Sequence, residues 1–143
     1  MQRAQTRVAR RGSLIYDTST VGIILDATAL IAAPTSFFLQ TLIQTHIDQG
    51  RPFVVPVLAL SAAANSDNRV TRASINHRGI WIVDFTAALV DDIAELAREA
   101  TAPTALDILH CAYEAISTDI FPIVTRQPAA YTNIPHPLHL EPL

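Results

Sequence analysis

Polar residues stand at the carboxyl ends of two expected strands. Asp26 directly follows the apolar run 21–25, and a second apolar run, 121–125, leads into the segment Thr125–Gln127. In a parallel α/β sheet, ligands bind outside the carboxyl ends of the strands. We therefore expect the chemistry of this chain, whether binding or catalysis, at Asp26 and around Thr125.

Strand-like and helix-like patterns alternate along the chain, which predicts an α/β fold. Apolar runs rich in Val, Ile and Phe predict strands at 21–25, 53–55, 80–85 and 121–125, with an edge strand at 138–140. Helical patterns cover 27–33, 37–48, 56–64, a short segment ending at His77, 86–100 and 105–117. Long helical connections imply a central, mostly parallel sheet of four or five strands, covered on both faces as a three-layer α/β/α sandwich.

The length and charge distribution predict one domain with a separate tail. At 143 residues, half of them apolar, the chain can build a single core. Residues 17–143 are expected to form the domain, and residues 1–16 a flexible tail. The first thirteen residues hold four Arg and no acid, whereas the rest holds six Arg and thirteen acids, a net charge of −7. The tail could bind phosphate backbones or be a transit-type peptide, and it could equally be a leader without function.

The cellular setting is expected to be the reducing cytoplasm, without a membrane. Cys111 is the only cysteine, so it cannot form an internal disulfide, and its apolar helical surroundings predict a buried structural thiol. No segment reaches the run of about 18 apolar residues that a membrane span needs. Asp26 interrupts the best run, 21–33.

Four segments occur in an order that resembles a known family. They are Ile23–Leu30 (IILDATAL), Val55–Ala63 (VPVLALSAA), Thr104–Ala112 (TALDILHCA) and Ile123–Tyr131 (IVTRQPAAY). Together they resemble the PIN domain, the fold of many bacterial toxin ribonucleases and RNA-processing nucleases. The resemblance implies phosphodiester hydrolysis by water activated on Mg²⁺ or Mn²⁺, which three or four clustered acids hold while leaving positions open.

The resemblance also implies which residues carry the site and which are missing. Asp26 and Asp107 match metal-binding aspartates, and Thr125 matches the threonine of the closing turn. Ala62 stands where the family has a glutamate, and Gln127 replaces the acid of that turn. Two carboxylates and a hydroxyl can still hold one Mg²⁺, which often uses one or two carboxylates, so we expect weak binding of a single Mg²⁺ or Mn²⁺.

Some of these residues could instead have structural roles. Asp26 could cap the helix that follows its strand, and Asp107 could complete a capping box begun by Thr104. Arg126 could place a positive charge near the metal or pair with an acid. His110, three residues after Asp107, is expected to be a packing residue.

The sequence leaves several functions open. The main hypothesis is a lapsed nuclease that acts by binding a protein or RNA, and the alternative is a Mg²⁺- or Mn²⁺-dependent ribonuclease, the toxin of a toxin–antitoxin pair. A small-molecule-binding domain is a third reading. The expected partners are a second copy of the chain, a small antitoxin-like protein, or RNA. The cluster Phe37–Leu39 is the candidate apolar patch for such an association.

Overall fold

The computed structural model describes residues 22–67, 69, 79–118 and 121–143. The expected tail at 1–16 and the helix expected to end at His77 lie outside the described residues.

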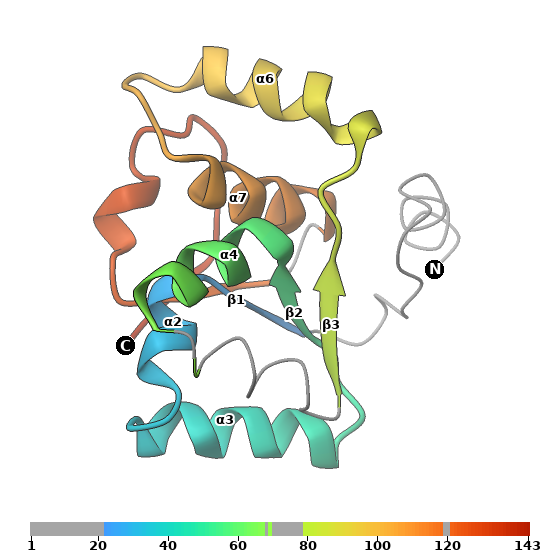
Figure 1. The fold of residues 1–143 in the computed structure, drawn as a ribbon, viewed down its shortest axis with the longest axis vertical. Coiled ribbons are helices and arrows are strands. Elements are labelled where there is room, and N and C mark those ends of the chain that lie inside the picture. Colours follow the sequence, from blue (N-terminus) through green and yellow to red (C-terminus); the bar gives the residue numbers. More distant parts are fainter. Residues whose placement is uncertain (1–21, 68, 70–78, 119–120) are drawn as a thin grey trace.

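Five short strands alternate with helices in the described part (Figure 1). The strands are β1 (Ile23–Leu25), β2 (Phe53–Pro56), β3 (Ile80–Val83), β4 (Ile123–Thr125) and β5 (Leu140–Pro142). The α-helices are α2 (Ala27–Ala32), α3 (Phe37–Asp48), α4 (Val57–Ser66), α6 (Val90–Glu99) and α7 (Leu106–Thr118). Two 3₁₀ helices, η1 (Ala87–Leu89) and η2 (Pro128–Tyr131), precede α6 and β5.

The strands form one parallel sheet in the order β3-β2-β1-β4-β5. The chain leaves β1 toward β2 and β3 and later returns to β4 on the other side of β1. The strand order therefore reverses between β1 and β4, and a parallel α/β sheet commonly binds ligands at such a point. Leu25 lies opposite Val124 in the register, which brings Asp26 and Thr125 to the same edge of the sheet.

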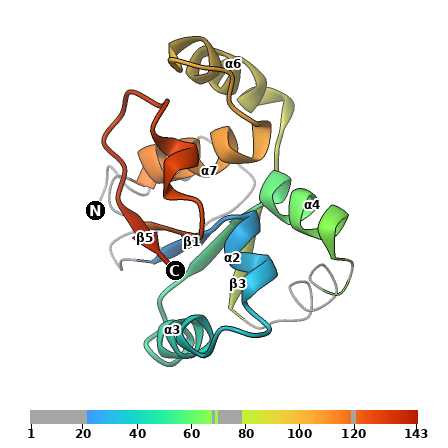
Figure 2. The same ribbon diagram turned by 90° about the vertical axis from the view of Figure 1, so that its left-hand side faces the viewer.

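Two apolar layers cover the faces of this sheet, because alternate residues of each strand point to opposite sides. Ile24, Val54 and Ile123 pack with the buried faces of α6 and α7. Leu25, Val55 and Val124 pack with α2, α3 and α4. Helices α3 and α6 lie at opposite ends of the molecule (Figures 1 and 2). The predicted three-layer α/β/α sandwich is confirmed, with five strands that are all parallel.

Some element boundaries differ from the predictions. The helix expected at 56–64 is Val57–Ser66, and it ends where Asp67 adopts an extended backbone. The last strand is Leu140–Pro142 instead of 138–140. Its pairing begins where the Ile123 amide donates to the His139 carbonyl at 2.8 Å.

None of the helices in the described ranges is both long and apolar enough to cross a membrane.

Candidate functional site

The carboxylate of Asp26 caps the first helix of the domain. Asp26 has an extended backbone directly after β1, and its Oδ1 accepts the Ala29 amide of α2 at 3.0 Å. The Thr28 hydroxyl donates to the same oxygen at 2.6 Å. An N-cap aspartate satisfies amides that have no partner inside the helix. The capping role considered for Asp26 is therefore what the hydrogen bonds show.

Tyr131 binds the other oxygen of this carboxylate from the far end of the chain. Its hydroxyl donates to Asp26 Oδ2 at 2.9 Å, across 105 residues of sequence. Only 1% of Asp26 and 3% of Tyr131 is exposed. Burial raises the pKa of Tyr131 above its usual range, and the nearby Cys111 and Asp26 raise it further. The phenol therefore stays protonated and remains a donor to the carboxylate.

Thr125 lies beside this network through Thr28. The two hydroxyl oxygens are 3.4 Å apart, and Thr125 Oγ1 also accepts the Gln127 amide at 2.9 Å. Thr28 Oγ1 in turn accepts the Arg126 amide at 2.9 Å. The structure thus brings Asp26 and Thr125 together, with Thr28 between them, and holds the turn after β4 against the start of α2.

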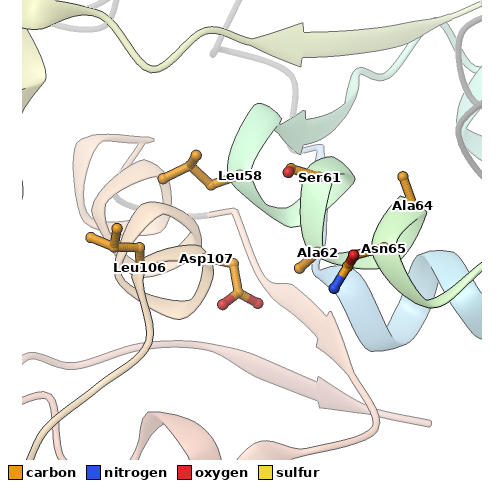
Figure 3. Close-up of a pocket in the computed structure, with 7 residues that line it drawn as sticks. All are labelled: Leu58, Ser61, Ala62, Ala64, Asn65, Leu106 and Asp107. Carbon is orange, nitrogen blue, oxygen red and sulfur yellow. The ribbon is translucent and has the colours of Figure 1, made fainter.

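Asp107 lies in the first turn of α7 and lines a hollow of about 510 Å³ between α4 and α7. Its neighbours in this hollow include Ala62, Ser61 and Asn65 (Figure 3). The carboxylate projects from α7 toward the side on which Ala62 and Asn65 lie. Ala62, which the PIN resemblance places at a glutamate position, therefore shares a hollow with Asp107. Gln127, which the same resemblance matches to an acid, is exposed.

The charge of Asp26 affects the carboxyl group of Asp107. Burial raises the pKa of Asp107 above its usual value, while the backbone amides of Asp107 and Ile108 oppose this effect. The charge of Asp26 also raises the pKa of Asp107. A like charge acts in this direction when it is near and poorly screened. The charge of Asp26 therefore acts on the Asp107 carboxyl group at the carboxyl edge of the sheet.

The residues at this edge do not fit a divalent metal ion. Asp26 Oδ1 already accepts two protein donors and Oδ2 accepts one, so one acceptor position is left on a carboxylate that is almost fully buried. Mg²⁺ usually keeps several of its waters, which a buried carboxylate cannot accommodate. No group of three or more His, Cys, Asp or Glu that could hold a metal occurs among the described residues.

The other candidate polar residues are described by their burial and their contacts within the protein. His110 is fully buried, and its ring meets Phe85 edge-on at a centroid distance of 5.4 Å, in agreement with a packing role. Burial and the charge of Asp26 raise the pKa of the buried Cys111 thiol well above its usual value, so the thiol stays neutral. Thr104 donates its hydroxyl to the Ala102 carbonyl at 3.0 Å. In the described part, Arg126 forms no ion pair with an acid.

Sequence reasoning missed Tyr131 and Thr28, the two side chains that complete the Asp26 network. One signal for Tyr131 was available: a buried tyrosine needs a partner for its hydroxyl, and its segment follows a strand that was expected to lie near Asp26. Thr28 gave no comparable signal, because a threonine in the first turn of a helix is common.

Comparison with known proteins identifies no family for this chain. None of the protein-family models and none of the curated proteins matches the chain. The PIN resemblance therefore stays a prediction that rests on the four sequence segments.

We expect Asp26→Ala to destabilise the fold by about 3 kcal/mol, because it removes a helix cap and leaves the Tyr131 hydroxyl without its acceptor. Asp26→Asn should cost less, since the amide oxygen can still cap α2. The control is Asp107→Asn, which should change the free energy of unfolding by less than about 0.5 kcal/mol because this side chain is half-buried in an open hollow. Urea unfolding at neutral pH measures all three.

Removal of a carboxylate whose role is to bind a metal would have the opposite effect on stability. Without metal it would be repelled by its neighbouring acid, and its removal would stabilise the protein. If Asp26→Ala is as stable as Asp107→Asn or more stable than the parent, the structural role of Asp26 is wrong.

Proposed function

We propose that the chain is a PIN-like domain whose metal-dependent nuclease chemistry has lapsed and which acts by binding a protein partner. The observation that carries this proposal is the engagement of both Asp26 oxygens by donors from the protein itself. The carboxylate that the family uses as a metal ligand serves here to cap α2 and to hold Tyr131. Ala62 and Gln127 at the remaining acid positions support the same conclusion.

The charge of the domain favours a protein partner over RNA. Outside the first thirteen residues the chain has six Arg and thirteen acids, so its net charge is −7. Affinity for RNA depends mainly on cationic side chains that neutralise phosphates. The carboxyl edge of the sheet also carries the charges of Asp26 and Asp107, which repel a phosphate backbone when no metal lies between them. A single, buried Cys111 is consistent with a reducing, cytoplasmic setting.

Two adjacent phenylalanines at the start of α3 form the surface that we propose for association. Phe37 is 82% exposed and Phe38 is 53% exposed. Burial of exposed aromatic rings is strongly favourable, and such rings often lie at the centres of interfaces. Leu39, which was expected to belong to this patch, is fully buried in the core below it. The patch is therefore Phe37 and Phe38, and a second copy of the chain is the partner we propose for it.

The first test is cleavage of single-stranded RNA with millimolar Mn²⁺ or Mg²⁺. We expect no cleavage by the unmodified chain above that of Asp107→Asn, because Asp26 and Asp107 do not form an open ligand set. Asp107→Asn is the better control since it should leave the fold intact. Metal-dependent cleavage that is lost in both Asp26→Asn and Asp107→Asn would replace this proposal with the ribonuclease alternative.

The second test concerns self-association. Sedimentation equilibrium should show a dimer whose dissociation constant rises at least about tenfold in Phe37→Ser/Phe38→Ser, as expected when two aromatic contacts are lost. Val90→Ser is the matched control, because Val90 is also an exposed apolar residue at 49% but begins α6 at the opposite end of the molecule. A monomer at every concentration, or a dimer that the double variant does not weaken, would refute the role of this patch.

A further inference from the structure

Helix α3 presents an almost uncharged outer face beyond its two phenylalanines. Its exposed residues after Phe38 are Gln40, Thr41, Gln44, Thr45 and Asp48, of which only Asp48 carries a charge. Helix α6, at the opposite end of the molecule (Figure 1), has five charged residues among its ten, and all five are exposed. The cores of protein–protein interfaces are depleted in charged residues, whereas a helix face that stays in water is usually charged. The outer face of α3, from Phe37 to Asp48, therefore has the composition of an interface.

The two ends of this face differ in charge. At the start of α3, Arg126 and Phe38 line a hollow of about 340 Å³. The Arg126 side chain is exposed, and its amide donates to Thr28 Oγ1 at 2.9 Å, which fixes the backbone of this residue beside the helix. At the other end, Asp48 is exposed and its Oδ1 accepts the Gln44 side-chain amide at 2.9 Å. The helix dipole adds positive charge to the first end and negative charge to the second.

Two copies related by a two-fold axis can pair their α3 helices in two directions, and every contact then occurs twice. Parallel pairing would bring Arg126 beside Arg126 and Asp48 beside Asp48, so that like charges face each other. Antiparallel pairing brings Arg126 of each copy beside Asp48 of the other. A crossing angle of about 20°, which is common for packed helices, keeps both ends of a twelve-residue helix in contact. Charge complementarity therefore favours the antiparallel arrangement.

We propose that the chain forms a two-fold dimer in which the α3 helices pack antiparallel, and that the Asp48 carboxylate of each copy enters the hollow beside Arg126 of the other. The guanidinium of Arg126 supplies charged donors for this carboxylate. The Ser36 hydroxyl accepts the Leu39 amide at 3.1 Å, which leaves the first amides of α3 without an acceptor inside the helix. These amides also favour a carboxylate at this end. The inference rests on the proposed function, which assigns the patch of Phe37 and Phe38 to a second copy, and it adds the orientation of that copy.

A second exposed arginine near α3, Arg51, lies outside this arrangement. It follows Gly50, whose positive φ of 66° turns the chain after the helix, and its amide donates to the carbonyl of the buried His46 at 2.8 Å. From there the chain runs into β2, so Arg51 leads toward the sheet and away from the outer face of α3. A change of charge at Arg51 therefore controls for the overall charge of the molecule.

Sedimentation equilibrium of the full chain with reversed charges tests the arrangement, at about 50 mM salt because surface charges are then weakly screened. Arg126→Glu and Asp48→Arg should each raise the dissociation constant of the dimer at least about fivefold, since each makes like charges meet at two symmetry-related contacts. The swap Arg126→Glu/Asp48→Arg restores opposite charges, so its dissociation constant should return to within about twofold of the parent's. Arg51→Glu, the matched control, should change it by less than about twofold.

Neutral variants cover the case in which a charge reversal does not fold, as judged by circular dichroism. Arg126→Gln and Asp48→Asn should each weaken the dimer by a smaller factor, and the double variant should be no weaker than either, because both changes remove the same contact. The inference is overturned if the dimer does not respond to either end, if the losses add instead of cancelling, or if Arg51→Glu weakens the dimer as much as Arg126→Glu.

These outcomes are separable from those of the proposed function. A dimer that Phe37→Ser/Phe38→Ser weakens, but that the charge reversals leave unchanged, would refute the antiparallel arrangement and keep the aromatic patch. A parent that is a monomer at every concentration would refute the patch and the arrangement together.

Discussion

The buried charge of Asp26 is the constraint on which the carboxyl edge of the sheet depends. An ionised carboxylate in the protein interior is tolerated only when hydrogen bonds replace the water it has lost. Here the Ala29 amide, the Thr28 hydroxyl and the Tyr131 hydroxyl supply those bonds. Because the donors belong to α2 and η2, satisfying one carboxylate fixes where the first helix starts and where the segment after β4 must lie.

The same network fixes the geometry around the point where the strand order reverses. Thr28 donates to Asp26 and accepts the Arg126 amide, so the turn after β4 is anchored to the first turn of α2. Holding the helix cap and ligating a cation are competing uses of a single carboxylate. Asp26 serves the first use, while Asp107 remains in an open hollow beside Ala62, where one acid alone holds a divalent ion poorly.

The α/β architecture could be predicted from the sequence because local patterns of apolar residues determine the helices and strands. The runs at 53–55 and 121–125 are rich in β-branched and aromatic residues, and both proved to contain strands. Leu89, Ile93 and Leu96, which share one stripe of the helical pattern 86–100, are all buried, although the first turn is a 3₁₀ helix. The position of Asp26 and Thr125 at the same edge of the sheet follows from the parallel arrangement, whereas the strand order was not predicted.

The long-range contact of the site could not be predicted in the same way, because it joins residues that are distant in sequence. The pairing of Tyr131 with Asp26 spans 105 residues, and no local pattern encodes it. The burial of Leu39 beside the exposed Phe37 and Phe38 likewise depends on how α3 rotates against the sheet. The two possible roles of Asp26 have the same sequence signature, since a cap and a metal ligand both place an aspartate directly after a strand.

An NMR titration with Mn²⁺ tests whether the protein itself satisfies the hydrogen-bonding needs of the Asp26 carboxylate. Paramagnetic Mn²⁺ bound at Asp26 would broaden the amide signal of Ala29, which donates to this carboxylate at 3.0 Å. We expect millimolar Mn²⁺ to leave the Ala29 signal as sharp as that of a buried amide far from Asp26, such as Ile93 in α6. Selective, chelator-reversible broadening of Ala29 at lower Mn²⁺ concentrations would show that the Asp26 carboxylate is an open metal ligand and that the protein does not satisfy it alone.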